Sequence, residues 1–143
     1  NPGNLGTILR TADWTGIRHA FCSKETADLY SPKVLQATMG SAARVKVSYN
    51  DLPAVLEMCA APVWGTFLDG ENIFTANLEQ RGVVVIGNEG NGISAEVERT
   101  VTRRLFIPPY PENRATVESL NAGGATAITL AAFRGRMYNE KTK

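Results

Sequence analysis

The sequence predicts an α/β fold in which a mostly parallel β-sheet is flanked by helices. First, short apolar segments rich in β-branched residues alternate with segments whose apolar residues recur every three to four positions. Second, the four apolar residues at 83–86 are typical of a strand covered on both faces, as in a parallel sheet. Since no repeat or low-complexity tract interrupts this pattern, 143 residues are expected to form one domain with its own core.

The first half of the chain is expected to begin with a helix and then to alternate strands with helices. Apolar residues at helical spacing predict a helix over 5–15, with Asn4 as its N-cap and Gly16 at its end. The elements expected next are a strand over 17–22, a helix over 32–39, a strand over 44–49, a helix over 52–59 capped by Asp51, and a strand over 63–67.

The second half continues the alternation and then changes character. A polar turn is predicted over 68–72, followed by the strand over 83–86, a helix near 95–101 capped by Ser94, and a strand over 105–107. Three prolines in residues 108–114 exclude regular structure there. A long Ala-rich helix then runs to about residue 138, and its small residues at 122–127 would let a neighbouring backbone approach closely.

Composition and charge restrict the function only weakly. A net charge of +1 argues neither for nor against a nucleic-acid partner. Cys22 and Cys59 lie in apolar runs without metal-binding spacing, which predicts buried free thiols in a reducing, cytoplasmic compartment. His19 is the only histidine, so no metal site is expected. No apolar run approaches the roughly 20 residues that a membrane span needs, so no membrane partner is expected.

The segment 83–94 is the first candidate for a binding site. Its strand leads into a turn with Gly87, Gly90 and Gly92 and then into a helix, which is the usual place for a ligand in an open α/β sheet. The Gly-Lys-Ser/Thr ending of a phosphate loop and the dinucleotide fingerprint G-x-G-x-x-G are both missing. A generic nucleotide- or flavin-binding domain is therefore a weak alternative, and the segment alone predicts only a small ligand.

Three polar stretches together carry a more specific signal. Residues 4–12, NLGTILRTA, fit the pattern N-x-G-x-I-x-R-T-A and are followed by Gly16. Residues 87–94 read GNEGNGIS after the buried strand, and Ile-Pro at 107–108 is followed by ESLN at 118–121 and a small-residue helix. In this order the three motifs resemble the SpoU-type branch of the SPOUT RNA methyltransferases, the TrmH-like ribose 2′-O-methyltransferases. The resemblance covers nearly the whole chain.

The chain departs from the family pattern at two places. The loop over 108–118 is longer than usual, and Ala-Gly-Gly-Ala at 122–125 replaces the more usual Val-Ser-Val-Ala, so we expect a differently shaped ligand-facing loop. The family's first strand would precede Asn1. Residues 1–143 are therefore expected to be a SpoU-type methyltransferase domain within a longer protein, in which that strand and any N-terminal RNA-binding domain come earlier.

The resemblance implies a cofactor, a topology and an assembly. It implies S-adenosylmethionine (AdoMet) held in a deep trefoil knot of the C-terminal part, a rare exception to the rule that chains do not thread loops. It also implies a homodimer in which motif one of one subunit completes the site of the other. By matching positions, the primary cofactor contacts would be Gly87, Ile107 and Leu120, and the secondary candidates are Thr66, Leu68, Asn88, Glu89 and Gly90.

The implied reaction is methyl transfer to a ribose 2′-hydroxyl of tRNA or rRNA. Arg10 would be the central catalytic residue, assisted by Asn4, Glu89, Ser119 and Asn121. Because an arginine side chain stays protonated in proteins, we favour a role in which Arg10 binds phosphate and stabilises the developing alkoxide; whether it also takes the proton stays open. Spacing alone also fits a solvated helix arginine, and a carboxylate at position 89 also fits a role in holding the turn.

RNA contacts and the competing functions complete the expectations. Arg114 is the favoured phosphate contact besides Arg10, while the other local cations are expected to be mostly solvated surface residues: Arg18, Lys24, Arg44, Lys46, Arg103 and Arg104. One alternative function is a catalytically inactive SPOUT-fold RNA-binding protein, against which the presence of all the motif residues argues. Another is methylation of a base, against which the first motif argues.

Overall fold

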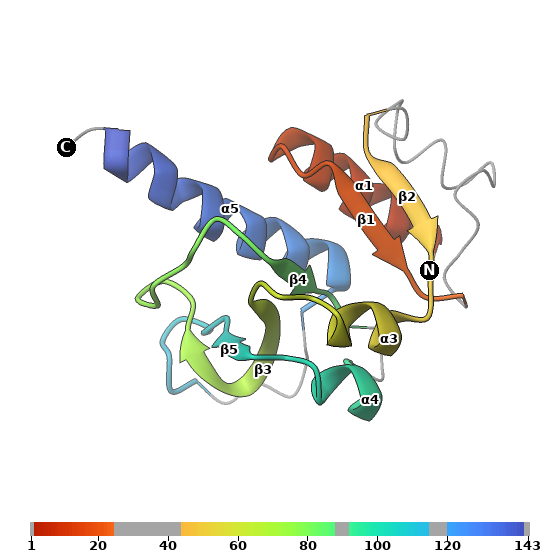
Figure 1. The fold of residues 1–143 in the computed structure, drawn as a ribbon. Helices are drawn as coiled ribbons and strands as arrows, with labels where there is room; N and C mark the ends of the chain where they lie inside the picture. The colour runs from red at the N-terminus through yellow and green to blue at the C-terminus, as the bar shows by residue number, and fades with distance from the viewer. Residues whose placement is uncertain (1, 25–43, 88–91, 115–119, 142–143) are drawn as a thin grey trace.

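The computed structural model describes residues 2–24, 44–87, 92–114 and 120–141, and the predicted helix over 32–39 lies outside these ranges (Figure 1). None of the described helices is long and apolar enough to cross a membrane. The helices and strands of the described residues are, in chain order, α1 (Pro2–Trp14), β1 (His19–Cys22), β2 (Lys46–Tyr49), α3 (Leu52–Glu57), β3 (Val63–Asn72), β4 (Val83–Val85), α4 (Ala95–Glu98), β5 (Arg103–Phe106) and α5 (Ala122–Lys141).

The described strands form two sheets, and every pair in them is parallel. β1 pairs with β2, His19 lying opposite Lys46. The second sheet has the order β4-β3-β5, so β3 is its central strand. This arrangement confirms the predicted α/β class with parallel pairing, although the hydrogen bonds divide the described strands into two sheets where one had been expected.

Helices cover both faces of the three-stranded sheet. On one face, Trp64 and Leu105 pack with Phe133 of α5. On the other, Val63 and Val85 belong to a cluster with Leu56 of α3 and Val97 of α4. Neighbouring residues of β3 thus point into different clusters, as the alternation of a strand requires. The prediction that the strand over 83–86 is covered on both faces is confirmed, since Val84 packs against the α5 side.

Helix α1 covers one face of the two-stranded sheet. Its buried residues Leu5, Leu9 and Ala12 pack with Cys22 of β1 and Val45 before β2. Burial raises the pKa of the Cys22 thiol, because the thiolate would lose its hydration there. Both cysteines are free, but Cys59 is only half-buried.

Signals at the helix ends were predicted with mixed success. Gly16 has φ +78°, and the N–H of Ile17 donates to the carbonyl of Ala12, so α1 ends in the expected glycine motif. Ser94 caps α4 by accepting a hydrogen bond from the N–H of Val97. The expectation for Asn4 was wrong, because α1 begins at Pro2 and places Asn4 inside the first turns. Asp51 precedes α3, but its side chain forms no capping hydrogen bond.

Strand β3 is longer than expected, and the predicted polar turn over 68–72 is wrong. Figure 1 shows β3 as a strongly curved ribbon beside β5. Thr66 and Glu71 both pair with Leu105, so β3 contacts the same part of β5 before and after its curve. A Cβ on Gly70 would overlap the backbone of Leu105. Glycine is therefore needed here because two backbones meet, which sequence-local turn chemistry does not reveal.

Helices α1 and α5 pack against each other. A Cβ on Gly123 would lie 3.2 Å from Cγ2 of Thr7. Further along, Arg134 Nε donates a 2.6 Å hydrogen bond to the carbonyl of Thr15. The small residues at 122–127 were predicted to admit a neighbouring backbone, but the close neighbour at Gly123 is the side chain of Thr7, and a Cβ on Gly124 would meet nothing within 4 Å.

Candidate active site

The carboxyl ends of three parallel strands meet at one edge of the second sheet. Gly65 of β3 pairs with Val85 of β4 and with Arg104 of β5. β4 ends at Val85, β5 ends at Phe106, and the regular pairing of β3 with β5 is interrupted after Thr66. Because the strands are parallel, Thr66, Gly87 and Ile107 all follow the paired residues on the same side. These three predicted cofactor contacts therefore share one edge, where ligands of open α/β sheets bind.

Gly87, which follows β4, lies close to the backbone of Gly92 and Ile93. A Cβ on Gly87 would lie 2.7 Å from the carbonyl carbon of Gly92 and 2.8 Å from the nitrogen of Ile93. No side chain fits between these backbones, so position 87 requires glycine. The other predicted residues of this turn, Asn88, Glu89 and Gly90, lie outside the described residues.

Two of the predicted cofactor contacts have aliphatic side chains that are not packed into the core. Leu68, on the curve of β3, is 91% exposed, and Leu120, before α5, is 52% exposed. Thr66 and Ile107 are half-buried. Exposed aliphatic side chains such as these suit contact with the flat, apolar face of a ligand.

The first and third motifs are brought together by the packing of α1 on α5. Asn121 Oδ1 accepts a 2.8 Å hydrogen bond from the N–H of Gly123 and so caps α5. Gly123 in turn contacts Thr7, which lies one helical turn from both Asn4 and Arg10 on α1. Asn4 is half-buried, and Arg10 is exposed. Asn121 therefore has at least a structural role beside the motif-one helix.

Two predicted site residues are not placed with this group. Ser119 lies outside the described residues. Arg114 is exposed on the irregular loop after β5, where its N–H donates to the carbonyl of Pro111. The loop contains no helix or strand over 108–114, as its prolines predicted. No described contact joins Arg114 to α1 or to the start of α5.

Arg104 is not the solvated surface residue that the sequence suggested. Its guanidinium forms ion pairs with Asp69 at 2.6 Å and Glu98 at 2.9 Å. It also lies over the ring of Phe67, 3.7 Å from the centroid. The hydrogen bond from Arg104 lowers the pKa of Asp69. Arg104 thus ties the curve of β3 to β5 and α4.

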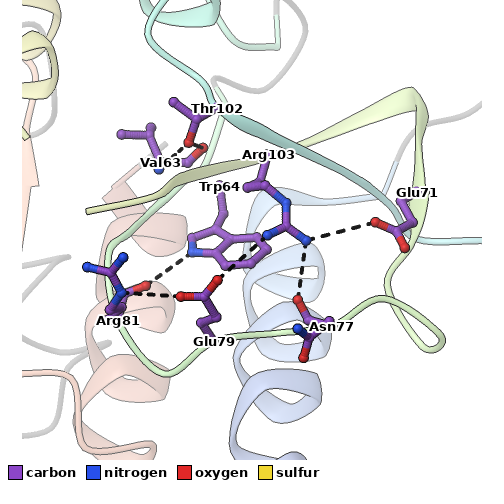
Figure 2. A network of polar contacts seen from close by, with 8 residues as sticks. All are labelled: Val63, Trp64, Glu71, Asn77, Glu79, Arg81, Thr102 and Arg103. Carbon is purple, nitrogen blue, oxygen red and sulfur yellow. Dashed lines mark hydrogen bonds and ion pairs between the residues drawn. The ribbon is translucent and has the colours of Figure 1, made fainter. Parts of the chain in front are cut away.

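Arg103 is held in a second network on the opposite face (Figure 2). Its guanidinium lies 4.6 Å from the Trp64 ring centroid and donates a 3.3 Å hydrogen bond to the carbonyl of Asn77. Glu79 and Glu71 lie 3.9 and 4.0 Å from its nitrogens. Neither network has a local sequence signal, because Asp69, Glu71 and Glu79 are distant in the chain from the arginines and Glu98 belongs to a different element. Both arginines therefore stabilise the sheet and are poor candidates for binding phosphate.

Comparisons with known proteins agree with this arrangement. The SpoU rRNA methylase family matches residues 1–131. The 23S rRNA (guanosine(2553)-2′-O)-methyltransferase RlmP of Bacillus subtilis is 32% identical over 139 residues, which cover 94% of this chain and 54% of that protein.

Solved structures show the same likeness. A TrmH-family protein from Porphyromonas gingivalis superposes with a TM-score of 0.86 at 44% identity, over 95% of this chain and 56% of that one. The SpoU methyltransferase AviRb from Streptomyces viridochromogenes, solved in complex with AdoMet, superposes with a TM-score of 0.83 at 26% identity, over 96% and 54%.

The chain belongs to the SpoU rRNA methylase family. It spans about half the length of the curated relatives it matches. Among the described residues, no three His, Cys, Asp or Glu side chains gather where they could hold a metal ion.

Proposed function

We propose that this chain transfers a methyl group from AdoMet to a ribose 2′-hydroxyl of RNA. The observation that carries the proposal is the shared edge of Thr66, Gly87 and Ile107, with the motif-one helix packed on the start of α5. Family membership supports the same conclusion, because the relative from Bacillus subtilis is named as a 23S rRNA 2′-O-methyltransferase. The alternative is an inactive RNA-binding protein, and the methyl-transfer assay described below distinguishes it from an enzyme.

The residues at the edge fit AdoMet. An adenine ring is flat and apolar with hydrogen-bonding groups at its rim. The peptide groups around Gly87 and Ile107 would bind that rim, while the aliphatic side chains of Leu120 and Leu68 would cover the faces. Thr66 would contribute from β3, and Asn88, Glu89 and Gly90 are further candidates from the turn.

Arg10 would organise the acceptor ribose. When bound, AdoMet supplies an electrophilic methyl group on a sulfonium, which is a good leaving group. The protein must therefore mainly orient the 2′-hydroxyl and favour loss of its proton. A permanently charged guanidinium would bind the neighbouring phosphate and stabilise the alkoxide as it forms. Asn4, Glu89, Ser119 and Asn121 would fix the arginine, the phosphate or the ribose.

The finer features of the family are also part of the proposal. A deep trefoil knot would fit the contacts that β3 makes with Leu105 on both sides of its curve. We infer that residues 1–143 act as the methyltransferase domain, that it works as a homodimer, and that it resides in the cytoplasm, where its two free thiols would stay reduced. We favour rRNA over tRNA as the substrate because the similar RlmP is named for 23S rRNA.

Replacing Leu120 with aspartate is expected to abolish AdoMet binding. The substitution places a charge where the aliphatic side chain would cover the adenine, and desolvating an unpaired carboxylate is costly. Met58→Asp is the matched control, because Met58 is also exposed but ends α3 at the opposite, amino-terminal side of β3. Calorimetric titration with AdoMet should show binding by the control and none by Leu120→Asp. Equal AdoMet affinities of the two variants would contradict the assignment of Leu120 to the cofactor site.

Methyl transfer itself is tested with labelled AdoMet and total tRNA or rRNA. We expect label in the RNA and, after digestion to nucleosides, in 2′-O-methyl ribose. Label in a base would contradict the assignment to ribose. Binding of both AdoMet and RNA without transfer to either RNA would favour the inactive alternative.

A further inference from the structure

An exposed tryptophan stands beside the proposed catalytic arginine. Trp14 is 90% exposed, whereas Trp64, the second tryptophan of the chain, is 1% exposed. Trp14 ends α1 and follows Arg10 by four residues, so the two exposed side chains lie on one face of the helix, one turn apart. That separation, about 6 Å along the helix axis, is short enough for neighbouring nucleotides to contact both.

Cations gather at the same end of α1. Arg18 follows the turn that ends the helix, and its carbonyl accepts a 2.8 Å hydrogen bond from the N–H of Lys46, so both exposed side chains stand where β1 and β2 begin. Arg44 forms two hydrogen bonds, of 2.8 and 2.7 Å, with Asp13, the neighbour of Trp14. Residues 13–24 and 44–51 contain four Arg and Lys side chains and two carboxylates, Asp13 and Asp51, and Asp13 is paired with Arg44. The surroundings of Trp14 are therefore basic.

We propose that Trp14 is a stacking platform for a base next to the methylated nucleotide, with Arg18 and Lys46 binding the phosphates that follow. This inference rests on the proposed function, since it places the reacting ribose at Arg10. Single-stranded RNA is bound through bases stacked on aromatic side chains and through cations along the backbone. The positive surroundings favour RNA over a second, equally basic copy of this surface.

Binding of single-stranded RNA tests the platform without requiring turnover. With an oligoribonucleotide of about ten nucleotides, we expect RNA to quench the exposed tryptophan of the unaltered chain. Trp14→Ala should weaken binding, measured by anisotropy of labelled RNA, by about tenfold. Trp14→Phe should keep most of the affinity while the quenching disappears, because phenylalanine still stacks. Met58→Ala removes an equally exposed apolar side chain elsewhere and should change neither signal.

The cations are tested by salt dependence. Each phosphate contact to a single strand contributes about 0.7 to the slope of log K against log salt, so Arg18→Ala combined with Lys46→Ala should lower that slope by about 1.4. An unchanged slope would show that Arg18 and Lys46 do not bind the RNA phosphates.

The outcomes separate the platform from the reaction. Equal RNA affinity of Trp14→Ala and the unaltered chain would overturn the platform, even if methyl transfer occurs. A change of mass by light scattering with unaltered RNA affinity would likewise overturn it and assign Trp14 to an interface between copies. Quenching and weakened binding without any methyl transfer would instead uphold the stacking of an RNA base on Trp14 and reject the proposed reaction.

Discussion

Arg10→Ala should lose methyl transfer by about a hundredfold or more while binding AdoMet almost as well as the unaltered chain. The exposed guanidinium lies on α1, whereas the proposed cofactor contacts lie at the strand edge of the other sheet. Removing it would leave that edge intact but would leave the acceptor phosphate and the developing alkoxide without a cation. Single-turnover transfer from labelled AdoMet to RNA measures the first effect, and calorimetric titration measures the second.

Arg81→Ala is the matched control for this experiment. Arg81 is an exposed arginine before β4, at the amino-terminal side of the sheet, and its side chain pairs with Glu79. The control should keep its transfer rate. Arg10→Lys keeps the positive charge but loses the planar guanidinium, so we expect a rate between that of the unaltered chain and that of Arg10→Ala. Transfer by Arg10→Ala at the rate of the control would reject the catalytic role.

Gly70→Ala should lower the free energy of unfolding by about 3 kcal/mol, the upper part of the range for overpacked sites. The added Cβ would lie 2.7 Å from the nitrogen of Leu105 and closer still to its carbonyl group, and backbone atoms of a paired strand have little freedom to move aside. Either β3 must straighten or β5 must shift. The midpoint and slope of urea unfolding measure the change.

Gly135→Ala gives the comparison that isolates this effect. Gly135 lies inside α5, and a Cβ there would meet nothing within 4 Å. Alanine should therefore stabilise the helix, by up to about 1 kcal/mol. If both variants shifted the unfolding midpoint in the same direction by similar amounts, the close contact between Gly70 and Leu105 would be contradicted.

Local patterns predicted the elements better than they predicted the contacts between them. The stop at Gly16 and the cap at Ser94 depend on neighbouring peptide groups, and the sequence predicted both correctly. The residues at 68–72 have the composition of a turn, yet they belong to β3, because Glu71 and Asn72 at the end of this range pair with β5. A partner strand that follows β4 and α4 in the chain decided that conformation, and no local pattern contains it.

The site shows the same division. Matching motifs indicated Thr66, Gly87 and Ile107, and the strand register places all three at one edge. Arg104 carries the same charge as any RNA-binding arginine, so only its partners Asp69 and Glu98 reveal its structural role. The charge of a side chain can be taken from the sequence. Whether that charge is already paired with a carboxylate depends on the tertiary contacts.

Calorimetric titration of the chain with AdoMet tests the central claim most directly. The proposed edge predicts saturable binding with one site per chain, because each chain contributes its own Thr66, Gly87, Ile107 and Leu120. The absence of saturable binding by a chain that circular dichroism shows to be folded would contradict the cofactor site, and with it the proposed methyl transfer.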